Sequence, residues 1–129
     1  MKKSIAVSIA TMVFGAASLL AHHGYAEYDR NAPVSLEGTV KSVLWANPHI
    51  LVLLETKDKV DYSVEFSAPG NIERRHVEKS TFLKVGDYVL IKGSINRNPE
   101  KKILTMIREV HRPSDGWELI FPFTPTPAK

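Results

Sequence analysis

Residues 33–49 read PVSLEGTVKSVLWANPH and carry the most informative strand pattern of the chain. Its first half alternates apolar residues or glycine with polar residues, which is the period of a half-buried β-strand. After Lys41 the apolar residues move to the other parity, starting at Val43, and such a change inside one strand predicts a β-bulge or bend. Gly38, in the middle of the strand, suits sharp coiling. We therefore expect a long, strongly bent first strand.

The Asn47-Pro48 dipeptide predicts a tight corner after this strand, with Trp45 covering one end of the core. Further strand patterns follow at 49–56, 60–68, 88–95, 101–111 and, in a short form, 117–121. Between the third and fourth strands, Asn71 is a candidate cap for a short helix with Glu73 in its first turn.

This order, β-β-β-α-β-β, predicts an all-β fold with one short helix, arranged as an OB-like five-stranded Greek-key barrel. Another small barrel and a two-layer sheet are the alternatives. We expect His49 at the corner between the first two strands, and four apolar residues of the helical region in the core. These four residues are Ile72, Val77, Phe82 and Leu83.

Residues 1–21 have the layout of a secretory signal peptide: Lys2 and Lys3, an apolar run, and the small residue Ala21 at its end. A membrane anchor is the alternative, because the run is close to the lower length limit for crossing a bilayer. We expect cleavage after Ala21, with a cut after Ser18 as the competing choice. The sequence therefore predicts a periplasmic or secreted protein.

Cleavage after Ala21 would leave 108 of the 129 residues, which is enough for one modest core. We divide these residues into an N-terminal segment at 22–33, an OB-like barrel domain at 34–121 and a flexible proline-rich tail at 122–129. The chain has 17 basic and 14 acidic side chains, and two of the lysines lie in the leader, so the mature net charge is about +1. The absence of cysteine excludes disulfides and thiolate chemistry.

Cleavage after Ala21 would place His22-His23 at the mature N-terminus. An N-terminal histidine offers its free amine and its own ring nitrogen to one metal ion, a chelate that suits copper in a square-planar arrangement. His49 is a candidate third nitrogen if the N-terminal segment folds over the corner. The candidate metal ligands are therefore His22, His23 and His49, for copper or zinc. The alternative is a flexible N-terminus and a hydrogen-bonded corner histidine without a metal.

No catalytic constellation is visible: the sequence has no nucleophile with its base, no glycine-rich phosphate loop and no serine elbow. Glu37 and Glu65 have the pattern of solvated carboxylates on polar strand faces, and residues 73–76 have that of a basic surface patch. His111 has no partner that the sequence identifies. We therefore expect no catalytic residues and no cofactor beyond a candidate copper or zinc ion.

Several segments together resemble a domain-of-unknown-function family of small secreted bacterial proteins. That family begins its mature chain at His-His, carries a Trp-x-Asn-Pro-His motif, and places an aromatic–Glu pair before a short arginine-bearing helix and a Gly-Asp turn. The matching positions are His22, His23, Gly38, Thr39, Val40, Trp45, Asn47, Pro48, His49, Glu65, Arg74, Arg75, Gly86 and Asp87.

The chain departs from this family at two places. Ser63 or Tyr62 stands where the family often has tryptophan, and His76 stands where it often has glycine. The resemblance implies an exported small β-protein and implies no established activity.

Three functions stay open. The first is an exported, non-enzymatic module that binds copper or zinc through the three histidines. The second is a metal-independent module that binds a peptide, glycan or protein of the cell envelope through its barrel face. An enzyme, such as a redox copper protein, is the weakest because no acid–base pair is visible. Export and near-neutral charge oppose nucleic-acid binding, and we expect a monomer without stable membrane insertion after cleavage.

Overall fold

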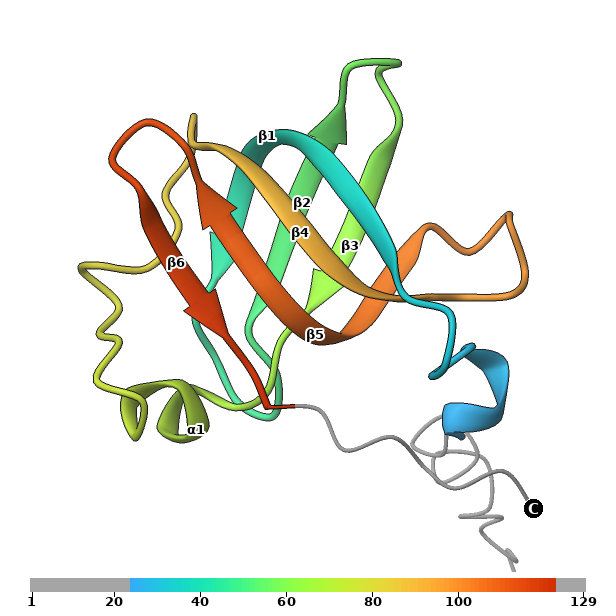
Figure 1. Ribbon diagram of the computed structural model, residues 1–129, viewed down its shortest axis with the longest axis horizontal. Coiled ribbons are helices and arrows are strands. Elements are labelled where there is room, and N and C mark those ends of the chain that lie inside the picture. The colour runs from blue at the N-terminus through green and yellow to red at the C-terminus, as the bar shows by residue number, and fades with distance from the viewer. Residues whose placement is uncertain (1–23, 123–129) are drawn as a thin grey trace, which may run out of the picture.

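The computed structural model describes residues 24–122, which form a small β-barrel with one short helix (Figure 1). A single 3-10 turn, η1 (Tyr25–Glu27), precedes the strands. The strands are β1 (Val34–Leu44), β2 (Leu51–Thr56), β3 (Asp61–Glu65), β4 (Tyr88–Ile95), β5 (Ile103–Arg112) and β6 (Trp117–Ile120). The helix α1 (Pro69–Glu73) lies between β3 and β4 in the chain. The predicted β-β-β-α-β-β order is therefore confirmed, with β6 as an additional strand.

Five of the strands close into a barrel. Neighbouring strands follow the order β3-β2-β1-β4-β5-β6, and a parallel pairing between β3 and β5 closes the ring. The other pairings are antiparallel, and β6 extends the sheet beyond β5 (Figure 1). The architecture is the predicted OB-like five-stranded barrel.

The first strand is bent as its sequence predicts. Gly38 pairs with both β2 and β4, and the register with β2 shifts between Val40 and Ser42, which brackets the predicted bulge at Lys41. A side chain at Gly38 would not fit, because its Cβ would lie 2.2 Å from the backbone carbonyl oxygen of Glu55. Glycine at this position therefore lets two neighbouring backbones approach closely enough to coil the barrel.

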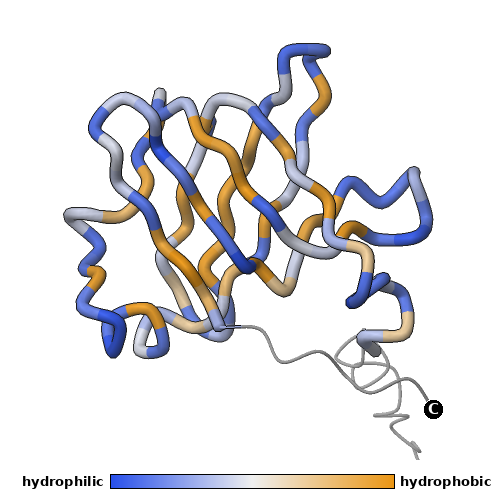
Figure 2. Tube along the Cα trace, viewed as in Figure 1, coloured by the Kyte–Doolittle hydropathy of each residue, from blue (hydrophilic) through white to orange (hydrophobic). Residues whose placement is uncertain are grey.

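One apolar core fills the barrel. Figure 2 shows hydrophobic segments along the strands and hydrophilic segments in the β2–β3 turn and in the loop between β4 and β5. The four residues predicted from the helical region are all buried: Ile72, Val77, Phe82 and Leu83. Phe82 is fully buried, and its ring packs edge-to-face on Trp45 with ring centroids 5.3 Å apart. Trp45 is only partly buried, at the margin of the core rather than inside it.

The helix begins earlier than the sequence predicts. We expected Asn71 as the cap, but α1 starts at Pro69 with Ala68 at the N-cap and has no acidic residue in its first turn. Proline suits the first helical position because its fixed φ matches the helix. A backbone N–H at that position would have no partner within the helix, so its absence in proline costs nothing. The side chain of Asn71 instead accepts a hydrogen bond from Arg74.

Candidate functional site

His49 lies in the connection between β1 and β2, as predicted, directly after the cis Asn47-Pro48 bond. Its ring nitrogen Nδ1 is 3.1 Å from the backbone carbonyl oxygen of Phe66. A carbonyl oxygen can only accept, so this hydrogen bond forms when Nδ1 carries the proton. The neutral ring then keeps its lone pair on Nε2. Metal-bound histidines are oriented in this way, with the second ring nitrogen donating to a carbonyl or a carboxylate.

A pocket of about 210 Å³ lies beside His49, at a gap in the barrel wall. β3 pairs with β5 over only two residues of each strand, and β6 pairs with β5 from Glu109 onward. The part of β5 between these pairings, residues 105–107, forms one wall of the pocket. Tyr25, Glu65 and Phe121 also line it, so four separate parts of the chain meet His49 there.

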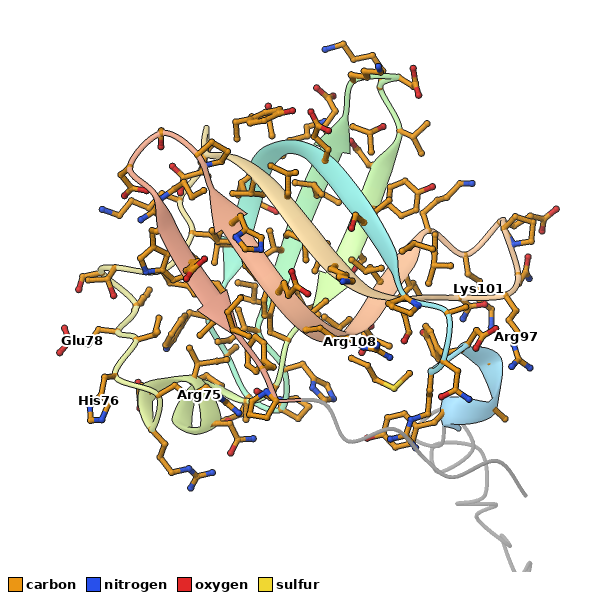
Figure 3. All side chains as sticks on the ribbon, in the orientation of Figure 1. Arg75, His76, Glu78, Arg97, Lys101 and Arg108 are labelled. Atoms are coloured by element: carbon orange, nitrogen blue, oxygen red, sulfur yellow. The ribbon has the colours of Figure 1, made fainter. Side chains whose placement is uncertain are left out.

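The N-terminal segment is fastened to the loop that joins β4 and β5. The carboxylate of Glu27 accepts hydrogen bonds from Asn96 Nδ2 and from Lys101 Nζ, each at 3.1 Å. The Arg97 amide donates to the Glu27 carbonyl at 2.8 Å. Tyr28 is buried and forms a β-bridge with Asn96. Arg97 and Lys101 are labelled beside this turn in Figure 3. Together these contacts fix the position of the chain from η1 onward.

Two of the predicted metal ligands, His22 and His23, lie outside the described residues. Tyr25 follows His23 by two positions, and it lines the same pocket as His49. Within residues 24–122, no group of three or more histidine, aspartate or glutamate side chains is placed to hold a metal ion. Of the three candidate ligands, the structure therefore describes only His49.

Sequence reasoning missed the contributions of Glu27, Glu65 and Met106. Glu65 was expected to be a solvated carboxylate, but it is half-buried and lines the pocket. Met106 lines the same pocket and has a φ of 48°, in the left-handed region. No sequence signal marks either feature, because both depend on where β5 separates from β3.

His111 has partners that the sequence did not identify. Its Nε2 is 3.2 Å from Glu109 Oε2, and its Nδ1 is 3.4 Å from Glu118 Oε2. Lys92 and, to a smaller degree, His111 hold the pKa of Glu109 below its usual value. The residues at 73–76 form an exposed patch, as expected, and Glu37 is exposed as well.

A second polar cluster, centred on Arg112, is structural. This guanidinium donates to Asp87 at 3.1 Å and to the Phe82 carbonyl at 3.2 Å, and it binds both carboxylate oxygens of Asp115. Hydrogen bonds from Arg112 hold the pKa of Asp115 below its usual value, and Asp115 raises the pKa of Arg112. The cluster joins the end of β5 to the segment before β4.

Comparison with known proteins identifies a family and no closer relative. No curated protein and no solved structure matches the chain significantly. None of the helices within residues 24–122 has the length and apolar character needed to cross a membrane. The model of a family of unknown function, DUF6152, matches residues 10–105, which is most of the chain. This match confirms the expected membership of a domain-of-unknown-function family: the chain belongs to the family DUF6152.

Proposed function

We propose that this protein is an exported, non-enzymatic β-barrel module that binds one copper or zinc ion at its N-terminus. In the proposed site the free amine and ring of His22 chelate the metal, and His49 or His23 supplies a further nitrogen. Export and cleavage after Ala21 belong to the proposal, since only cleavage creates the amine.

One observation carries the proposal: Tyr25 and His49 line the same pocket. The two residues between His22 and Tyr25 can span only about 10 Å of extended chain, because each step covers about 3.3–3.6 Å. A histidine at position 22 or 23 therefore has a short path to the pocket. The contacts of Glu27 support this reasoning, since they fix the point from which the segment starts.

The hydrogen bonding of His49 also favours a metal ligand. Its Nδ1 is directed to the Phe66 carbonyl, and the side chain is exposed, so a metal ion can approach Nε2 from solvent. Copper(II) should bind this nitrogen set more tightly than zinc, following the usual order of divalent affinities. The amine and rings must lose their protons to bind, so affinity falls as the pH falls.

Native mass spectrometry of protein purified from the periplasm tests the proposal. We expect a mass that begins at His22 and, after copper(II) is added, a complex with one ion. His49→Ala should lose copper to a competing chelator at a lower chelator concentration, whereas His111→Ala should retain it as the parent does. His111 is the matched control, because it is bonded between Glu109 and Glu118 and does not line the pocket.

Three results would count against the proposal. An uncleaved chain would remove the chelating amine, and a cleaved chain that binds neither copper nor zinc would leave a metal-independent module. Equal copper retention by His49→Ala and the parent would remove His49 from the site.

A further inference from the structure

We infer that Met106 supplies a thioether ligand next to His49, so that the site selects copper(I) over zinc. This inference rests on the proposed function and adds a ligand of different chemistry. Met106, in β5, and His49, in the connection between β1 and β2, line the same pocket of about 210 Å³.

The backbone at Met106 is unusual. Its φ of 48° lies in the left-handed region, which residues other than glycine, asparagine and aspartate rarely adopt. The irregularity falls where β5 shifts its register: Ser94 pairs with Thr105, but Lys92 pairs with Glu109. Three residues of β5 therefore stand opposite the single residue between Lys92 and Ser94. Bulges of this kind redirect side chains and are frequent beside functional sites.

The bulge depends on a close approach of backbones. The residue opposite it is Gly93, where a Cβ would lie 2.7 Å from the carbonyl oxygen of Thr105. Met106, in the bulge, is half-buried at the pocket wall. The strained backbone therefore lies at Met106. The other two methionines of the chain, Met1 and Met12, precede the predicted cleavage site.

The donor chemistry points to copper(I). A thioether sulfur is a soft ligand that favours copper(I), while imidazole nitrogen suits copper and zinc alike. A site with amine and imidazole donors alone would favour copper(II), so the thioether changes which ion is bound best. A thioether carries no proton at ordinary pH, so acid does not compete for this ligand.

A single-methyl NMR experiment tests the assignment without any substitution. Mature protein labelled with [methyl-¹³C]methionine should give one methyl resonance, from Met106. One equivalent of copper(I), added as its acetonitrile complex without oxygen, should shift this resonance, and zinc should leave it near its original position. A resonance that stays in place when copper(I) saturates the protein would overturn the inference.

Met106→Leu provides the second measurement, because leucine keeps a similar volume and lacks the sulfur. In competition with bicinchoninate, this variant should lose about tenfold or more in copper(I) affinity, while its zinc affinity changes less than about twofold. Unchanged copper(I) affinity, with copper(II) binding that still depends on His49, would overturn this inference alone. If the parent protein binds none of the three ions, both the inference and the proposed function are wrong.

Discussion

The side-chain amide nitrogen Nδ2 of Asn96 lies 3.1 Å from the carboxylate of Glu27, although 69 positions separate the two residues in the sequence. Asn96 is buried, and Glu27 also accepts a hydrogen bond from Lys101. This contact holds η1 against the loop between β4 and β5. The chain is therefore held beside this loop from η1 onward.

Replacing Glu27 should weaken metal binding although Glu27 is not a ligand. In Glu27→Ala the N-terminal segment loses the two side-chain hydrogen bonds to Asn96 and Lys101, while the backbone contacts of Glu27 and Tyr28 remain. We expect copper(II) affinity to fall about tenfold, as it does when residues that orient ligands are removed. The matched control is Glu100→Ala in the same loop, where Glu100 is exposed. Calorimetric titration measures both variants. A loss of the same size in Glu100→Ala would show that the effect is not specific to the anchor.

Metal affinity should depend on pH through the histidine rings. Protons compete with a metal ion for the imidazole nitrogens, and a protonated ring cannot bind a metal. Copper(II) binding should therefore be strong at pH 7 and weaken steadily below about pH 6. Titrations at three pH values measure this change. Affinity that is constant between pH 7 and pH 5 would exclude histidine ligands.

Gly38→Ala should destabilise the barrel by about 1–3 kcal/mol, the usual cost of forcing an extra group into a packed region. The added Cβ would lie 2.2 Å from the carbonyl oxygen of Glu55, which is backbone and has little freedom to move. Gly70→Ala is the control, since no atom lies within 4 Å of its added Cβ. Urea unfolding of both variants compares them, and equal stability would contradict the close approach at Gly38.

Arg112→Met should cost about 1–3 kcal/mol of unfolding free energy, because it removes the guanidinium donor from the half-buried carboxylate of Asp87 and from the Phe82 carbonyl. The pKa of Asp115 is lowered in the folded protein, so the ionised form of this residue favours folding. That contribution is present above the ordinary aspartate pKa of about 3.9 and is lost as the pH falls through the lowered value. The stability difference between Arg112→Met and the parent should therefore be smaller at pH 3 than at pH 7, as measured by thermal unfolding.

The periodicity of the sequence was enough to predict the strands and the barrel. The alternation before Lys41 and the change of parity after it are local, and they report directly which face of β1 is buried. The predicted start of the helix at Asn71 was wrong. A capping residue and a proline both signal a helix start, and here the two lie within three positions of each other. Here the proline begins the helix.

The surroundings of the candidate site could not be predicted in the same way. His49 could be placed at a corner from Asn47-Pro48, but its neighbours Tyr25, Glu65 and Met106 come from three distant segments. These three residues lie close together because β3 and β5 pair over only two residues each. That short pairing arises when the barrel closes, and the pattern of a single strand does not reveal it.

The most direct test is a copper(II) titration of four mature chains: the parent, a chain with one alanine inserted before His22, His49→Ala, and the combination of both changes. The insertion moves the amine away from the ring of His22 and leaves all three imidazoles in place. If the amine and His49 bind one ion, each single change should weaken binding by about tenfold or more. The combination should then bind only as a flexible His-His terminus does. Binding by the His49→Ala chain that equals that of the parent would contradict the shared site.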